Sequence, residues 1–140
     1  MKRIAKVQNQ AELREFCRSV KCKLTKDNSN YAKNRYRLWL FHSVDFRNNQ
    51  VSEGYYDERL YKFSQKIYPG CDIGLLTFGG KLDNGKLSDG TIKLHRDHNY
   101  ASSLAISVNL GEAIFTYDEQ DYLLTDGDII KFNCKNPHKF

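Results

Sequence analysis

The sequence has no run of apolar residues long enough to cross a membrane, and its start, MKRIAKVQNQAEL, lacks the apolar stretch of a signal peptide. These absences argue against a membrane-spanning or secreted protein. Internal repeats, low-complexity tracts and long linkers are also missing. With 140 residues, 40% of them hydrophobic and 28% charged, residues 1–140 are expected to fold as one domain with a substantial core.

Cysteine is present, but never in the CxxC spacing that is typical of zinc and redox sites. The four cysteines are Cys17, Cys22, Cys71 and Cys134. Their wide separation favours free thiols, which are typical of a reducing compartment. We therefore expect a cytoplasmic protein with no membrane partner.

Acidic residues do not balance the basic ones, and the net charge is +5. Half of the 22 Lys and Arg residues fall within the first 37 positions. A basic face can attract nucleic acid, but this excess is modest and unclustered, which favours an ordinary solvated surface. Nucleic acid is therefore kept as a possible partner that charge alone does not establish.

The first half of the chain contains two segments with apolar residues at helical spacing. They predict amphipathic helices over residues 11–24 and 55–68, and Pro69 and Gly70 end the second one. Between them, the aromatic and apolar residues 35–46 predict a strand. Asn48, Asn49 and Gly54 then indicate a loop.

After residue 70 the pattern changes to short apolar runs separated by turn residues. The expected strands are residues 71–80, 91–95, 104–109, 113–117, 122–124 and 128–133. The dipeptides Asn84-Gly85 and Asp89-Gly90 predict a hairpin or a loop between the first two of these strands. A helical part, 1–70, followed by a strand-rich part, 71–140, predicts an α+β domain with a β-sandwich or barrel core.

Candidate metal ligands lie near both ends of the strand-rich part. His95-Arg96-Asp97 places an imidazole and a carboxylate two residues apart, so both can face one ion from the end of an extended segment. His138 can supply a second imidazole. Two His and one carboxylate form the facial triad that holds non-haem Fe(II) and leaves positions open.

Two further histidines are weighed against this set. His98 could pair with His95 at helical spacing, but no helical periodicity surrounds them, so Asp97 is preferred. His42 lies within an expected strand with no neighbouring ligand, which favours an ordinary core or surface histidine.

The strands between the candidate ligands carry a family resemblance. His95-x-Asp97, the strand SLAISVNLGEAIF (residues 103–115), the segment TDGDIIKFN (residues 125–133) and the distal His138 resemble the Fe(II)- and 2-oxoglutarate-dependent dioxygenases. The order of parts is similar to that of the AlkB-like branch of the family.

This resemblance covers residues 73–140 and implies a double-stranded β-helix (jelly-roll) core, preceded by the two helices. It implies that His95, Asp97 and His138 hold Fe(II), with 2-oxoglutarate as the co-substrate. The implied reaction is the hydroxylation or oxidative demethylation of an unknown substrate.

One feature departs from the family pattern. The family carries an Arg on a strand after the distal His, where it binds the far carboxylate of 2-oxoglutarate, but here only Lys139 and Phe140 follow His138. Alternation should turn Lys139 away from the metal. We therefore expect that a further segment or a complementing chain supplies the last strand, or that the domain has degenerated; Lys93 or Lys131 is the alternative anchor.

Two readings from other classes remain open at this point. One is a non-catalytic, cupin-like jelly-roll module that binds metal, and the other is a basic nucleic-acid-binding protein. Both predict no turnover of 2-oxoglutarate, and the second also predicts binding that weakens with salt.

Overall fold

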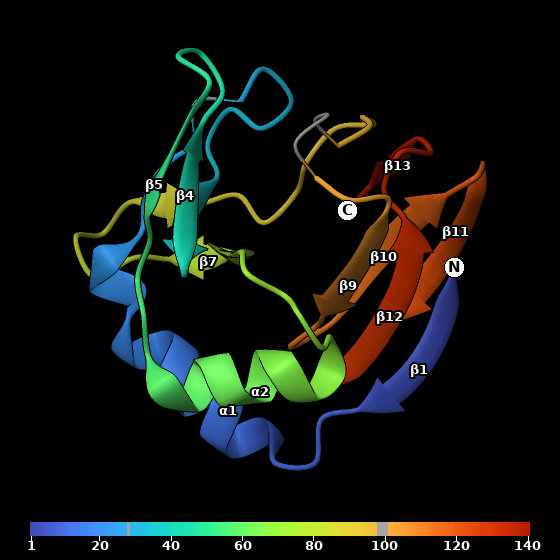
Figure 1. Cartoon of the computed structure of the whole chain (residues 1–140), viewed down its shortest axis with the longest axis horizontal. Coiled ribbons are helices and arrows are strands. Elements are labelled where there is room, and N and C mark those ends of the chain that lie inside the picture. Colours follow the sequence, from blue (N-terminus) through green and yellow to red (C-terminus); the bar gives the residue numbers. More distant parts are fainter. Residues whose placement is uncertain (28, 98–100) are drawn as a thin grey trace.

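The fold combines two helices with several small, mostly antiparallel sheets (Figure 1). The computed structural model describes residues 1–27, 29–97 and 101–140. The expected α+β class is confirmed. The first half is less helical than expected, because its described residues, 1–27 and 29–70, form five strands besides the two helices.

The helices are α1 (Gln10–Ser19) and α2 (Glu58–Ile67), with a 3-10 turn at Lys21–Lys23. The strands of the first half are β1 (Lys2–Lys6), β2 (Thr25–Lys26), β3 (Tyr36–Leu40), β4 (His42–Asp45) and β5 (Gln50–Glu53). Those of the second half are β6 (Gly74–Phe78), β7 (Gly80–Lys81), β8 (Leu87–Ser88), β9 (Leu104–Val108), β10 (Ala113–Tyr117), β11 (Gln120–Leu124), β12 (Asp128–Asn133) and β13 (His138–Lys139).

Both predicted helices exist, but each is shorter than the apolar pattern indicates: α1 ends at Ser19 and not at residue 24, and α2 begins at Glu58 and not at residue 55. The carboxylate of Asp57 accepts hydrogen bonds from the backbone N–H groups of Arg59 and Leu60, so α2 begins at Glu58. Asn9 caps α1 in the same way. Each helix has ten residues, and no helix within the described residues is long and apolar enough to span a bilayer.

The strand expected over residues 35–46 is broken at Phe41, whose φ of 70° turns the chain. As a result, β3 pairs with β2 and β6, whereas β4 forms a separate hairpin with β5. The prediction of a loop from Asn48 to Gly54 is therefore wrong for Gln50–Glu53.

The strand-rich second half is confirmed, and none of its described residues is helical. The turn at Asn84-Gly85 joins β7 and β8 into the expected hairpin. Residues 91–95, predicted as a strand, form only an isolated bridge between His95 and His138. The edge strand β1 was not predicted, because all five of its residues are exposed and give no apolar alternation.

Two three-stranded sheets enclose the core. One has the order β1-β12-β9 and the other the order β11-β10-β13. The fully buried side chains between them are Phe115, Leu124, Ile130 and Cys134. Alternation along β12 directs Ile130 and Phe132 into this core and Ile129 to the opposite face of its sheet.

The helices lie on the outer face of the sheet β1-β12-β9. Ile129 lines a largely apolar cavity of about 490 Å³ together with residues of β1, α1 and α2. Neither helix has a fully buried residue, although both are amphipathic. The helix layer is therefore packed more loosely than the core between the two sheets.

Truncation of a core side chain tests this description. Ile130→Ala should lower the free energy of unfolding by about 2–5 kcal/mol, because a fully buried side chain leaves a cavity behind. Ile114→Ala on the neighbouring β10 is the matched control: Ile114 is 58% exposed, so its loss should cost less than about 1 kcal/mol. Urea unfolding measures both; equal losses would contradict the assigned core.

Candidate metal centre

Backbone pairing brings the two ends of the strand-rich half together. The N–H of His95 donates to the carbonyl of His138 at 3.0 Å, and the N–H of His138 donates back to the carbonyl of His95 at 2.9 Å. On one side, the Asp97 N–H donates to the Cys134 carbonyl at 2.9 Å. On the other side, the Ile92 N–H donates to the Phe140 carbonyl at 3.3 Å. Residues 92–97 thus run antiparallel to residues 134–140.

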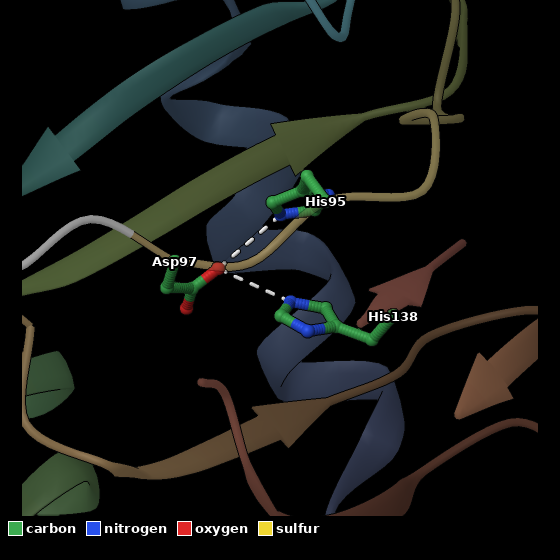
Figure 2. Close-up of side chains that lie close together, drawn as sticks. All are labelled: His95, Asp97 and His138. Atoms are coloured by element: carbon green, nitrogen blue, oxygen red, sulfur yellow. Dashed lines mark ion pairs between the residues drawn. The ribbon is translucent and has the colours of Figure 1, made fainter. Parts of the chain in front are cut away.

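This pairing assembles all three predicted ligands (Figure 2). Asp97 Oδ1 lies 3.2 Å from His95 Nε2 and 3.1 Å from His138 Nε2. The three ligand atoms all lie within 4.8 Å of one another, a separation that one metal ion can bridge. Figure 2 shows the carboxylate oxygen directed at both rings from the segment that carries His95.

Backbone carbonyls fix which ring nitrogens face the carboxylate. His95 Nδ1 lies 2.8 Å from the Lys93 carbonyl, and His138 Nδ1 lies 2.8 Å from the Asn136 carbonyl. A carbonyl oxygen can only accept, so both Nδ1 atoms carry the proton. In the neutral rings the Nε2 atoms then present lone pairs toward Asp97. Bonds of this kind orient metal-binding histidines, and three converging lone pairs suit a cation.

In the metal-free chain, hydrogen bonds from protonated imidazole nitrogens hold the Asp97 carboxylate beside the two rings. Burial alone would raise the pKa of Asp97, but hydrogen bonds from His138 and His95 outweigh it and hold that pKa well below its usual range. Burial alone would lower the pKa of His138, but the contact with Asp97 outweighs it, and the pKa is raised. A metal ion would therefore compete with a proton for the same position.

Aromatic rings close one side of the cluster. The ring of Phe132 meets that of His138 edge-on at 5.0 Å, and Phe115 lies 6.2 Å from the same ring. His138 is only 3% exposed, whereas Asp97 is partly accessible. Tyr31 packs beside the His95 ring at 5.7 Å. The cluster is thus shielded from solvent at His138 and accessible to solvent at Asp97.

Cys134 is a neighbour of the site that sequence reasoning missed. Its carbonyl holds the backbone of Asp97, and its thiol donates to the Ser102 carbonyl at 2.9 Å. Burial and the nearby charge of Asp97 raise the pKa of Cys134 to about 11, so the sulfur stays a neutral thiol. The signal was available, because alternation from Ile130 and Phe132 places residue 134 on the inner face.

His42 does not belong to the cluster of described ligands. His42 lies on β4, is exposed, and places its Nδ1 2.6 Å from the carbonyl of Asp72. It is thus a surface histidine, one of the two ordinary positions expected for it. His98, the alternative to Asp97, lies outside the described residues.

The three lysines considered as an anchor for 2-oxoglutarate point elsewhere or are solvated. Lys139 is exposed next to buried His138, as alternation predicted. Lys131 is exposed on the face of β12 opposite to Phe132. Lys93 is also exposed, and it is its carbonyl that contacts His95.

No protein-family model, curated protein or solved structure matches this chain. Its function has to be inferred from the cluster itself.

Alanine substitutions test the ligand set. His95→Ala, Asp97→Ala and His138→Ala should each weaken Mn(II) binding on the order of 100-fold, since loss of a ligand should cost at least as much as loss of its outer hydrogen-bond partner. His42→Ala and His98→Ala should leave the affinity unchanged. Calorimetric titration of the metal-free chain measures all five. Binding that survives Asp97→Ala but is lost in His98→Ala would show that the carboxylate was chosen wrongly.

The cluster also predicts how the stability of the metal-free chain depends on pH. His138 has a higher pKa in the folded chain than in the unfolded chain, where it is about 6.5. Its protonation therefore stabilises the fold fully below about pH 6.5, and this stabilisation is lost as the pH rises through the folded pKa. The lowered pKa of Asp97 contributes above about 3.9 and is lost as the pH falls through its folded value. The cluster should therefore stabilise the metal-free fold most between about pH 4 and 6.5.

The affinity for Mn(II) should change in the opposite direction to the stability of the metal-free chain as the pH rises above about 6.5. This affinity should rise with pH until His138 has lost its proton, because the ion binds the neutral ring. Thermal unfolding with and without Mn(II) from pH 5 to pH 8.5 measures both effects, and His42→Ala serves as the control variant. An Mn(II)-induced gain in the unfolding temperature that is independent of pH would contradict competition between proton and metal.

Proposed function

We propose that this chain is a non-haem Fe(II)- and 2-oxoglutarate-dependent dioxygenase domain that hydroxylates or oxidatively demethylates an organic substrate. The observation that carries the proposal is the convergence of His95 Nε2, Asp97 Oδ1 and His138 Nε2. Two neutral imidazoles and one carboxylate, with other coordination positions free, are the ligand set of the facial triad.

The donors present fit Fe(II). The ligand atoms are nitrogen and oxygen, and the nearest sulfur, in Cys134, is held as a neutral thiol by burial. A thiolate would favour softer metals. Held by His95, Asp97 and His138, Fe(II) would supply, with 2-oxoglutarate and oxygen, an oxidative decarboxylation that gives succinate and carbon dioxide and leaves one oxygen atom for the substrate.

The chain's own residues prepare the site for that chemistry. The carbonyls of Lys93 and Asn136 hold the two imidazoles in the tautomer that leaves Nε2 free. Phe132 and Phe115 exclude water behind His138, which strengthens electrostatic contacts within the cluster. The partly accessible Asp97 side is the approach left for the co-substrate and the substrate.

The arrangement of strands supports a jelly-roll core. The segments that carry the family resemblance, residues 103–115 and 125–133, contain β9, part of β10, and β12. They contribute to the two sheets that pack face to face around Phe115 and Ile130, with the ligand cluster beside this core.

The far carboxylate of 2-oxoglutarate needs a cation that Lys93, Lys131 and Lys139 are poorly placed to supply. In the described residues, β9 ends its sheet and pairs with β12 alone. A free strand edge can accept another strand. We propose that an Arg-bearing strand, from a further segment or a complementing chain, adds at this edge and completes the site.

A cupin-like module that only binds metal is the second candidate. The exposure of these three lysines favours it, because metal binding alone requires no carboxylate anchor. A basic nucleic-acid-binding protein is a weaker alternative, supported only by the net charge of +5.

Linkage between the co-substrate and the metal separates these functions. If 2-oxoglutarate chelates the bound ion, it must raise the affinity of the chain for Mn(II). Mn(II) must then raise the affinity of the chain for 2-oxoglutarate by the same factor. We expect this coupling in the unmodified chain, reduced in strength because Lys93, Lys131 and Lys139 are poorly placed to bind the far carboxylate, and none in Asp97→Ala. Titration with succinate, which lacks the chelating keto group, is the control. An Mn(II) affinity that 2-oxoglutarate leaves unchanged would favour the metal-binding module.

Turnover provides the second test. With Fe(II), ascorbate and 2-oxoglutarate, the 140-residue chain should release little or no succinate, because Lys93, Lys131 and Lys139 are poorly placed to hold the far carboxylate. A segment that supplies the Arg-bearing strand, added in cis or as a separate chain, should restore release. Robust turnover by the chain alone would show that one of its own residues already serves as the anchor.

A further inference from the structure

Two lysines face each other on the outer surface of the sheet β1-β12-β9. The antiparallel register places Lys2 directly opposite Lys131. Residues paired in this way project from the same face with Cβ atoms about 5 Å apart, and like charges at such positions repel. This juxtaposition costs stability unless a negative group lies between or beside the two ammonium groups.

The other cations of β1 are neutralised within the chain. Arg3 Nε lies 3.7 Å and Lys6 Nζ 3.4 Å from the carboxylate of Asp128. No carboxylate pairs with Lys2 or Lys131 among residues 1–27, 29–97 and 101–140. Asp128 thus neutralises charge on Arg3 and Lys6, whereas no carboxylate within the described residues does so for Lys2 and Lys131.

The two lysines open onto a common cavity. It has a volume of about 340 Å³ and is lined by Met1, Lys2, Ser103, Leu104, Lys131, Phe132 and Asn133. No acidic residue is among them. Asn133 Oδ1 already accepts the backbone N–H of Lys135 at 3.0 Å, which leaves the side-chain NH₂ as its free group.

Each of the four polar side chains around the cavity can therefore donate a hydrogen bond. The two ammonium groups and the Asn133 amide can only donate from their free atoms, and the Ser103 hydroxyl can donate as well. We propose that this cavity binds a phosphate group, whose double negative charge matches the lysine pair and whose oxygens can accept from the amide and the hydroxyl. The group could belong to free phosphate or a small phosphomonoester, or to the backbone of a nucleic acid.

This site has Phe132 in common with the surroundings of the metal centre but includes none of the three candidate ligands. Lys131 projects from the face of β12 opposite to Phe132, whose ring contacts His138. Removal of the lysine charges should therefore leave Mn(II) affinity unchanged, and failure of one proposal leaves the other standing.

Titration of the metal-free chain with inorganic phosphate, followed by amide NMR, tests the proposal. Phosphate should shift the amide signals of Ser103 and Asn133 saturably. Lys2→Gln and Lys131→Gln should each weaken the affinity by about two- to five-fold, and the double variant should show no saturable shift. Lys66→Gln is the matched control, because Lys66 is an exposed lysine on α2 that lies outside this cavity.

A short single-stranded oligonucleotide distinguishes the two sources of phosphate. Binding that phosphate displaces and that Lys131→Gln weakens assigns the site to nucleic-acid backbone. Phosphate binding without oligonucleotide binding assigns it to free phosphate or a phosphomonoester. Shifts spread over many lysines, or an affinity that Lys2→Gln and Lys131→Gln leave unchanged, would overturn the proposal.

Discussion

The antiparallel backbone pairing between residues 92–97 and 134–140 is the contact on which the candidate site depends. The reciprocal hydrogen bonds of His95 and His138 set the register, and with it the side to which each imidazole points. Because side chains alternate along extended chains, a slip of one residue would turn His138 away and bring exposed Lys139 to the cluster. A few backbone hydrogen bonds thus determine whether three distant residues can share one ion.

The same segment ties the site to the core. Phe132 and Phe115 belong to the cluster of buried side chains between the two sheets, and their rings also contact His138. The hydrophobic interior therefore positions one ligand directly, whereas His95 and Asp97 depend on the loop that pairs with it. Burial decreases from His138 toward Asp97, which suits a site that must be fixed on one side and accessible on the other.

Much of this structure could be predicted from sequence, for identifiable physical reasons. Strands β9, β10 and β12 could be predicted because apolar, β-branched and aromatic residues are bounded there by turn residues, and the ligands follow from an i,i+2 pair and a distal His. Strand β1 escaped prediction because an exposed edge strand needs no apolar alternation. The imidazole tautomers were equally hidden, since the carbonyls that set them belong to the backbone of Lys93 and Asn136 and leave no mark in the residue types.

The turn at Phe41 has a consequence for motion. A non-glycine residue at positive φ costs about 1–2 kcal/mol, and the edge-on contacts of the Phe41 ring with Tyr61 and Tyr56, each worth about 0.5–1.5 kcal/mol, offset that strain. Side-chain contacts with α2, rather than a flexible glycine, therefore hold the direction in which the hairpin β4–β5 leaves the sheet. Because Tyr61 belongs to that helix, the hairpin and α2 should move as a single body, and a displacement of the loosely packed helix would be carried to the hairpin tip.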